Sequence, residues 1–180
     1  MAQQLELKGR RVALFVDNLY QEMEVWYPLY RLREAGAEVV TVGAHAGTTY
    51  TSKTGYPCVA EISYDAAEAD AFDGLVVPGG FAPDHIRRYP KAIQFTREID
   101  AQGKLVASIC HALWVACSAG ILRGRRTTCF FAIKDDVINA GGVYEDAEVV
   151  VDGNLVSSRK PDDLPAFCRA IIGVLAAQPE

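Results

Sequence analysis

Short, continuous apolar runs that alternate with helix-like segments restrict the fold of this chain more than any other feature. The four runs lie at residues 11–17, 38–43, 73–77 and 104–109. Such a run is typical of a strand that is buried on both faces of a sheet. Strands that alternate with helices form βαβ units, which build a mostly parallel sheet covered by helices on both sides. The sequence therefore predicts an α/β fold, a three-layer α/β/α sandwich of flavodoxin-like type.

Helices are expected between and after these strands. Residues 21–39 and 89–103 place apolar side chains at helical spacing, and Pro28 inside the first segment predicts a kink or a late helix start. Residues 44–72 mix Gly, Thr and Ser with short apolar alternations, which favours a hairpin or excursion followed by a short helix. The remaining expected elements are a helix over 134–142, a hairpin over 147–159 and a closing helix over 161–178.

Composition and charge exclude several classes of protein. Half of the 180 residues are hydrophobic and no linker or repeat divides the chain, so we expect a single domain over residues 1–180. The net charge of −5 and the lack of a basic run argue against nucleic acid as a partner. No segment reaches the ~18 apolar residues of a membrane span. The first ten residues lack the apolar stretch of a signal peptide, which predicts a cytoplasmic protein.

Cys110 stands out among the five cysteines, which form no CxxC pair and favour a reducing compartment. It follows the fourth apolar run directly and begins a helix-like segment, with His111 beside it. A thiol at a helix N-terminus faces free amides and the positive end of the helix dipole, which lower its pKa and could hold an oxyanion. The alternative is a small buried residue without a chemical role. Less reactivity is expected of Cys58, Cys117, Cys129 and Cys168.

Five segments of the chain together resemble the PfpI branch of the PfpI/ThiJ superfamily, over about residues 10–175. These segments are QEMEVWYPLYRLREAGAEV, DGLVVPGGFAPD, ASICHALWVACSAGILRGRRTT, IKDDVINAGG and AEVVVDGNLVSSRKPDDL. Members of this family are described as cysteine peptidases, as cofactor-free glyoxalases that turn methylglyoxal into lactate, as protein deglycases and as stress proteins. The resemblance implies a cysteine on a strand-to-helix nucleophile elbow and no cofactor. A metal is not expected either, because His45, His85 and His111 lack zinc-binding spacing.

The resemblance also assigns roles to residues of this chain. Cys110 matches the nucleophile, and Glu24 matches the carboxylate that lies against the thiol. A carboxylate so close is expected to be protonated and to donate a hydrogen bond to the thiolate, which raises its own pKa and lowers that of the thiol. The backbone N–H groups of Gly80 and His111 match the oxyanion hole. Two further residues are expected to line the substrate site, Gly79 and Phe130.

In the peptidase members, the base at the position of His111 takes its acid from a neighbouring subunit. That acid matches Asp84, which implies a homodimer or a higher homo-oligomer, such as a dimer of dimers or a hexamer. The chain departs from the family pattern here, because those relatives usually carry Glu at this position. Gln21 likewise stands where they have an acidic residue. The pocket wall differs at Ala112, Leu113 and Phe130.

Three functions stay open. In the first, the thiolate of Cys110 attacks an α-oxoaldehyde such as methylglyoxal, and Glu24 or His111 moves a proton between the adjacent carbons. In the second, Cys110, His111 and Asp84 hydrolyse peptides or amides across a subunit interface. In the third, Cys110 is an oxidative-stress sensor. A class I glutamine amidotransferase and a Cys–acid–His triad are excluded because no histidine follows His111. His85 stays a second candidate base.

Overall fold

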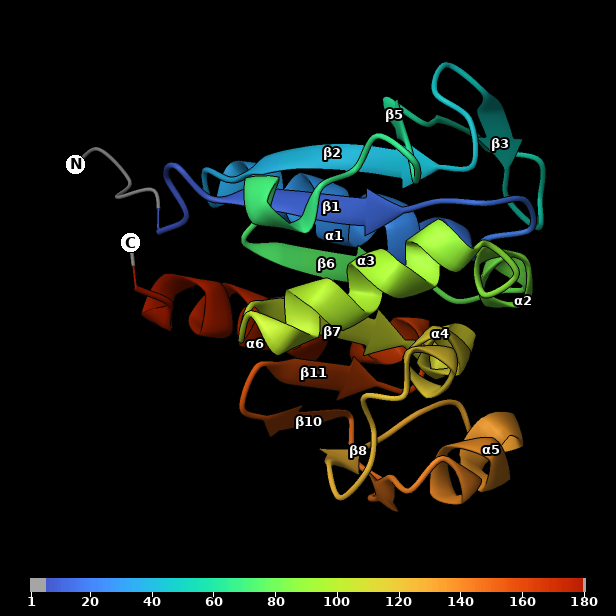
Figure 1. Cartoon of the computed structure of the whole chain (residues 1–180), viewed down its shortest axis with the longest axis vertical. Coiled ribbons are helices and arrows are strands. Elements are labelled where there is room, and N and C mark those ends of the chain that lie inside the picture. The colour runs from blue at the N-terminus through green and yellow to red at the C-terminus, as the bar shows by residue number, and fades with distance from the viewer. Residues whose placement is uncertain (1–5, 180) are drawn as a thin grey trace.

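The computed structural model describes residues 6–179 and has a seven-stranded central sheet (Figure 1). The strand order is β10-β11-β7-β6-β1-β2-β5, and every neighbouring pair is parallel except β10 with β11. The strands are β1 (Arg11–Phe15), β2 (Glu38–Gly43), β5 (Ile62–Ser63), β6 (Gly74–Val77), β7 (Leu105–Ile109), β10 (Val149–Asp152) and β11 (Leu155–Ser158).

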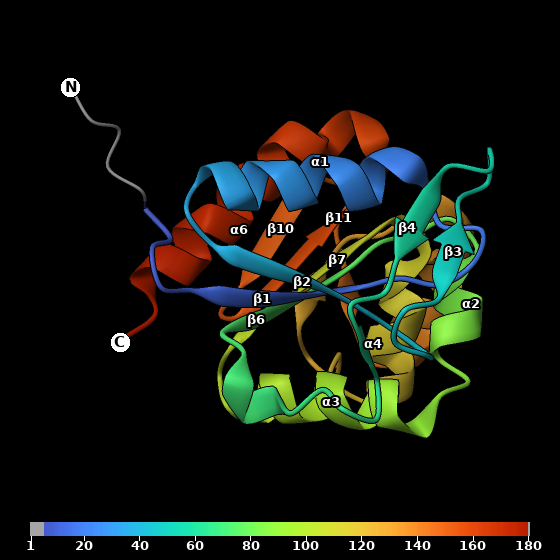
Figure 2. The same ribbon diagram turned by 90° about the horizontal axis from the view of Figure 1, so that it is seen from above.

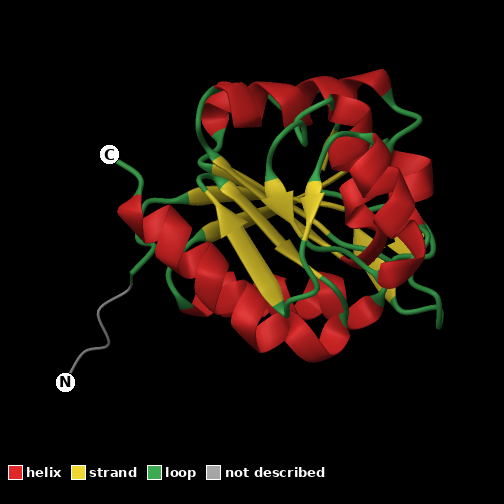
Figure 3. Cartoon of the chain, turned by 90° about the horizontal axis from the view of Figure 1, so that it is seen from below, coloured by secondary structure: helices red, strands yellow, loops and turns green. Residues whose placement is uncertain are grey.

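Helices cover both faces of this sheet, so the expected three-layer α/β/α sandwich is confirmed (Figure 3). The helices α1 (Glu22–Glu34) and α6 (Leu164–Ala177) lie on one face, and α3 (Pro90–Ala101) lies on the other (Figure 2). The shorter helices on the side of α3 are α2 (Ala82–Ile86) and α4 (Leu113–Ala119), beside which lies α5 (Lys134–Asn139).

The remaining elements are short. The segment between β2 and β6 holds a hairpin of β3 (Thr49–Thr51) and β4 (Pro57–Val59), then β5 and the 3₁₀ turn η1 (Ala69–Ala71), as the sequence predicts. A two-stranded parallel pair has no counterpart in the sequence-based prediction and consists of β8 (Arg126–Thr127) and β9 (Val143–Tyr144). Three more 3₁₀ turns are η2 (Cys110–Ala112), η3 (Phe131–Ile133) and η4 (Pro161–Asp163).

The strands β1, β6 and β7 form the buried centre of the sheet, which agrees with their continuous apolar runs. All residues of β6 and β7 are buried, and so are Val12 to Phe15 of β1. In the parallel register, Ala13 lies between Val40 of β2 and Leu75 of β6. Because helices cover both faces of these strands, neither face contacts water. Their sequences therefore need no alternation of polar and apolar residues.

Helix α1 starts at Glu22 rather than after Pro28, which lies inside it, so a late start was the wrong alternative. The side-chain oxygen of Gln21 accepts a hydrogen bond of 3.0 Å from the backbone N–H of Glu24 and caps the helix. Acidic residues in its first turn and arginines in its last turn complement the helix dipole. Gln21 thus holds the start of α1 without adding a second acid near the thiol.

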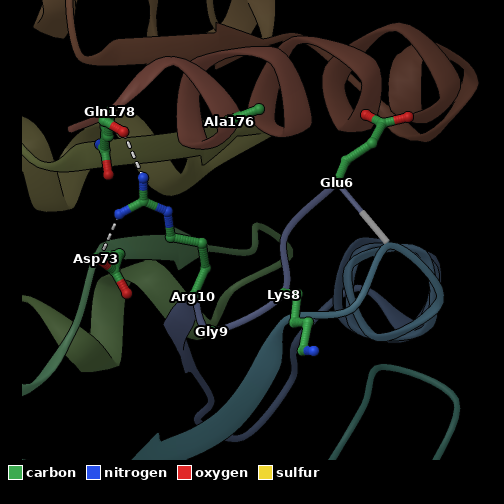
Figure 4. A pocket seen from close by; sticks show the side chains of 7 residues that line it. All are labelled: Glu6, Lys8, Gly9, Arg10, Asp73, Ala176 and Gln178. Atoms are coloured by element: carbon green, nitrogen blue, oxygen red, sulfur yellow. Dashed lines mark hydrogen bonds and ion pairs between the residues drawn. The ribbon is translucent and has the colours of Figure 1, made fainter. Parts of the chain in front are cut away.

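A hollow of about 450 Å³ lies at the edge where β1 and β6 begin (Figure 4). Arg10 beside it forms a 3.1 Å ion pair with Asp73, and its guanidinium also donates to the carbonyl oxygens of Gln178 and Pro179. These bonds tie the chain before β1 to the segment after α6. Their donors and acceptors are used within the fold, so we assign this hollow a structural role.

In the part of the chain from residue 6 to residue 179, no helix is both long and apolar enough to cross a membrane. The expectation of a single domain over 1–180 stays a prediction, because its outermost residues lie outside the described range.

Candidate active site

Strand β1 lies at the point where the chain order of the sheet reverses. After β1 the chain passes to β2 on one side, while β6 and β7 follow on the other side. Ligand sites in such sheets form outside the carboxyl ends of the strands at this switch point. A pocket of about 320 Å³ lies there. It is lined by Gln21, Glu24, Lys53, Gly80, Phe81, Cys110, His111, Phe130 and Pro161.

Cys110 occupies a sharp turn between β7 and α4. Its φ of +64° is in the left-handed region, where a non-glycine residue is strained, and the 3₁₀ turn η2 leads from it into α4. The carbonyl of Cys110 accepts a hydrogen bond of 3.2 Å from the backbone N–H of Phe130, which helps to hold the turn. The thiol lines the pocket although the residue is only 7% exposed. This geometry is the elbow that the resemblance implies.

Glu24 reaches the same point from the first turn of α1 and has no solvent-exposed surface. One carboxylate oxygen, Oε2, accepts a hydrogen bond of 2.7 Å from the backbone N–H of Gly79. The other, Oε1, is buried without a hydrogen-bond partner among the described residues. The N–H group of Gly79 is thus engaged by Glu24, and a direct role of Gly79 in holding substrate stays a prediction.

Gly79 allows the thiol and the carboxylate to approach each other. A Cβ atom built on Gly79 would lie 2.6 Å from Cβ of Cys110 and 2.6 Å from Oε2 of Glu24. Real Cβ atoms do not come so close to other atoms, so any larger residue would push the two groups apart. The absence of a side chain at this position is therefore a requirement of the site.

The backbone N–H groups of Gly80 and His111 lie close enough to the sulfur of Cys110 to lower the pKa of its thiol, so both donors are next to the atom that would attack a substrate. Gly80 has a φ of +74° and is crowded by backbone atoms of Leu19, Tyr20 and Gln21. Its amide is consequently held in place by the loop that joins β1 to α1.

Burial dominates the electrostatics of Cys110 and Glu24. It raises the pKa of Glu24 to about 7, against the lowering effect of hydrogen bonds from Gly79 and Cys110. Burial and the charge of Glu24 raise the pKa of Cys110 to about 12, against the lowering effect of the two amides. The expected rise for Glu24 is confirmed. The expected fall for the thiol is wrong, because loss of solvation outweighs the amides while Glu24 is ionised.

The two groups exchange protons as a pair. The first proton leaves at about pH 7 and the second at about pH 12, so between these values the pair holds one proton and one negative charge. A thiolate then forms by transfer of the thiol proton to Glu24, without a change in the net charge of the pocket. The amides of Gly80 and His111 favour that form because they donate to the sulfur.

His111 is placed to act as a neutral base or acid. Its Nδ1 lies 3.3 Å from the sulfur of Cys110, and its ring packs against Trp114 and Phe130 at centroid distances of 5.2 Å and 5.0 Å. Burial and the charge of Lys53 lower its pKa, so the imidazole is neutral at pH 7. Phe130 lines the pocket as expected and sets the orientation of this ring by packing.

Two residues singled out from the sequence point elsewhere. Asp84 forms an ion pair with Arg88 and makes no hydrogen bond to His111 within residues 6–179. His85 lies 3.6 Å from Asp17 and does not line the pocket. Within one chain, therefore, neither residue joins Cys110.

The other cysteines lack the surroundings of Cys110. Burial raises the pKa of Cys58 and Cys117 to about 11 and that of Cys129 and Cys168 to about 12. None of them lines the pocket. Over residues 6–179, no cluster of three or more His, Cys, Asp or Glu side chains is arranged to hold a metal ion.

Sequence reasoning missed three residues of the pocket wall, Lys53, Phe81 and Pro161. Phe81 and Pro161 lie in two of the segments that carry the family resemblance, but the resemblance assigns neither of them a role. Lys53 falls in the region between residues 44 and 72, for which only a hairpin or excursion was expected. The one available signal was a lysine in the Ser-Lys-Thr-Gly turn of that hairpin.

A family model described as the DJ-1/PfpI family matches residues 10–173. The chain is 45% identical over 165 residues to Deglycase PH1704 of Pyrococcus horikoshii, covering 92% of this chain and 99% of that protein. It is 36% identical over 167 residues to Putative cysteine protease YraA of Bacillus subtilis, covering 93% and 99%. A solved two-domain protein of Anabaena variabilis, with DJ-1/ThiJ/PfpI-like and ferritin-like domains, superimposes with a TM-score of 0.90 at 40% identity. That match covers 95% of this chain and 50% of the two-domain chain.

Proposed function

The chain belongs to the DJ-1/PfpI family, and on this basis we propose that it is a cysteine-dependent enzyme that converts α-oxoaldehydes into α-hydroxy acids, methylglyoxal into lactate among them. The observation that carries the proposal is the convergence of Cys110, Glu24 and two backbone N–H groups in one pocket of about 320 Å³. A relative at 45% identity that is named a deglycase supports chemistry of this class.

The reaction begins with the pair of Cys110 and Glu24. The carboxylate takes the thiol proton, and the sulfur attacks the aldehyde carbon, so that a C–S bond forms and the carbonyl electron pair moves to oxygen. The N–H groups of Gly80 and His111 stabilise this oxyanion until Glu24 returns the proton to it. The product of this step is a hemithioacetal.

The next step moves a hydrogen between the two carbons. Glu24 or neutral His111 removes the C1 hydrogen as a proton and delivers it to C2, while the hydroxyl proton on the C1 oxygen passes to the ketone oxygen. C1 is thereby oxidised to a thioester, and the ketone is reduced to an alcohol. Water then cleaves the thioester, the hydroxy acid leaves, and Cys110 regains its thiol proton. The oxidation and the reduction occur within one molecule, so no external oxidant is needed.

Incubation of the purified protein with methylglyoxal is expected to yield lactate, and Cys110→Ser is expected to reduce the rate to that of the uncatalysed reaction. Cys117→Ser is the matched control, because Cys117 lies on the helix that follows Cys110 but does not line the pocket. The control should retain the wild-type rate. Lactate formation by Cys110→Ser at the wild-type rate would refute the assignment of the nucleophile.

The distance of 3.3 Å between Cys110 and His111 favours a second candidate, cysteine peptidase chemistry. A relative named a putative cysteine protease supports it. The acid would be Asp84 of a second copy, because within residues 6–179 of one chain Asp84 makes no hydrogen bond to His111. Phe81 next to α2 is exposed, as is Met23 on α1, so apolar surface is available for such a copy to cover.

This second candidate requires at least a homodimer, and light scattering should then give at least twice the mass of one chain at micromolar concentration. Cleavage of fluorogenic peptides by the same sample is expected to fall with Asp84→Asn. A monomer would exclude the intersubunit triad and leave the pair of Cys110 and Glu24 unaffected.

A further inference from the structure

Lys53 brings a positive charge to the pocket that the reaction described above does not use. Among the side chains that line the pocket, Lys53 and Glu24 carry formal charges, while the low pKa of His111 keeps its ring neutral. Lys53 is exposed, and within residues 6–179 no carboxylate lies within 4.0 Å of its ammonium group. The charge is therefore available to a molecule that enters.

The position of Lys53 is fixed by its turn. Its backbone N–H donates to the carbonyl of Tyr20 at 3.0 Å, which joins the β3–β4 turn to the loop before α1. Glu22 in the first turn of α1 accepts hydrogen bonds from Ser52 at 2.8 Å and from the backbone N–H of Thr54 at 2.9 Å. The residues on either side of Lys53 are thus both bonded to the helix that carries Glu24.

The ammonium group lies over the ring of Phe81, 5.5 Å from the centroid. Phe81 and Phe130 form apolar parts of the same pocket wall. A charge beside apolar walls acts through a lower effective dielectric constant than a charge in bulk water, so its effect on an entering ion is larger. A neutral aldehyde gains nothing from this charge, a cation is repelled, and an anion is attracted.

An anionic substrate needs such a charge at this site in particular. Above about pH 7 the pair of Cys110 and Glu24 carries one negative charge, which would repel a second anion. Lys53 offsets that repulsion because its charge reaches both Glu24 and His111.

We propose that Lys53 makes this pocket select α-oxoaldehydes that carry a carboxylate group over neutral ones. The nature of the reaction rests on the proposed function, whereas the preference for an anion rests on the placement of Lys53 over Phe81 in the pocket that the thiol also lines. The substrate carboxylate contacts the ammonium group while its aldehyde carbon lies at the sulfur of Cys110.

Alkylation of Cys110 tests the preference without any turnover. Iodoacetate and iodoacetamide have similar size and attack the same sulfur, but only iodoacetate is anionic. The rate constant for iodoacetate divided by that for iodoacetamide is expected to fall about tenfold in Lys53→Met. This substitution keeps most of the length of the side chain and removes its charge. Lys91→Gln, an exposed lysine at the start of α3, is the matched control and should keep the wild-type ratio. An unchanged ratio in Lys53→Met would overturn the proposal.

Turnover supplies the second arm of the test. The substrate 4,5-dioxopentanoate is methylglyoxal extended at its methyl carbon by a carboxymethyl group. Its kcat/KM relative to methylglyoxal should fall about tenfold in Lys53→Met, mainly through KM. Equal preference in the two proteins would refute the role of Lys53 and leave the proposed function intact. Lack of turnover of both aldehydes by the wild type would refute the proposed function, and the alkylation ratio would still decide whether Lys53 selects anions.

Discussion

Glu24→Gln is expected to reduce lactate formation from methylglyoxal about 10³-fold, which corresponds to ~4 kcal/mol of transition-state stabilisation. The amide of glutamine can accept the hydrogen bond from Gly79, so the fold around it should persist. It cannot take the thiol proton or carry a proton from one carbon to the next. Steady-state kinetics with lactate as the measured product would show the loss mainly in kcat.

The same variant should change how the reactivity of Cys110 depends on pH. In the wild type, the rate of alkylation by iodoacetamide is expected to rise around pH 7, where the pair loses its first proton. Above that pH the rate should stay constant until the pH approaches about 12, where the pair loses its second proton. In Glu24→Gln the rise near pH 7 should disappear, because the proton acceptor is gone and burial still raises the pKa of the thiol. A rise that persists near pH 7 would mean that another group, such as His111, controls the thiolate.

Asp84→Asn separates the aldehyde reaction from the peptidase alternative. In the aldehyde reaction Asp84 is a surface residue paired with Arg88, so its loss should cost less than about tenfold, or ~1.4 kcal/mol. In the peptidase it orients His111, and its loss should be severe, as in other triads. If Asp84→Asn were as damaging as Cys110→Ala while Glu24→Gln stayed active, the aldehyde mechanism would have to be abandoned.

Gly80→Ala should be among the most destabilising single substitutions in the chain, at about 4 kcal/mol. The new Cβ would lie 2.5 Å from the carbonyl oxygen of Leu19, 2.6 Å from the amide nitrogen of Gln21 and 2.8 Å from the carbonyl carbon of Tyr20. All three are backbone atoms, so no side chain can rotate away. Urea denaturation would measure the loss as a lower midpoint at an unchanged slope.

Gly120→Ala is the control for Gly80→Ala, because it separates the effect of steric crowding from that of backbone strain. Gly120 ends α4 with a φ of +73°, almost the same as the +74° of Gly80, but a Cβ built there meets nothing within 4 Å. Its substitution should therefore cost only the left-handed conformation, about 1 kcal/mol. Equal losses in the two variants would show that the loop before α1 moves easily, and the oxyanion hole would then be less rigid than the contacts indicate.

The fold could be predicted from the sequence where local and tertiary requirements agree. The buried runs of β1, β6 and β7 are apolar because both faces are covered, so pattern and structure coincide. Helix α2 was missed because its five residues follow a Gly-Gly turn, contain Pro83 and are too short for a period to be visible. The pair of β8 and β9 was missed for the same reason, since two residues do not form a pattern.

The candidate site was predictable only in part. The resemblance placed Cys110 beside Glu24, and the structure brings them together at Gly79. The predicted direction of the pKa shift of the thiol was wrong. A sequence shows that a helix follows the cysteine, but it does not show how completely the site excludes water. Lys53 was missed because its role depends on a turn that is folded back against α1 by bonds to Tyr20 and Glu22, which no local pattern encodes.

The left-handed conformation of Cys110 bears on how such a chain would drift over evolution. A residue with a side chain at a φ of +64° costs roughly 1 kcal/mol that glycine would not cost. The fold bears this cost only because the turn places the sulfur at the carboxyl end of β7. A lineage that no longer used the thiol would gain stability from glycine at this position, while its neighbours in β7 would be held by the core. Without selection for the thiol, the cysteine would therefore be replaced sooner than the residues of β7. A descendant that keeps this cysteine would thus indicate continued selection for the chemistry of the thiol.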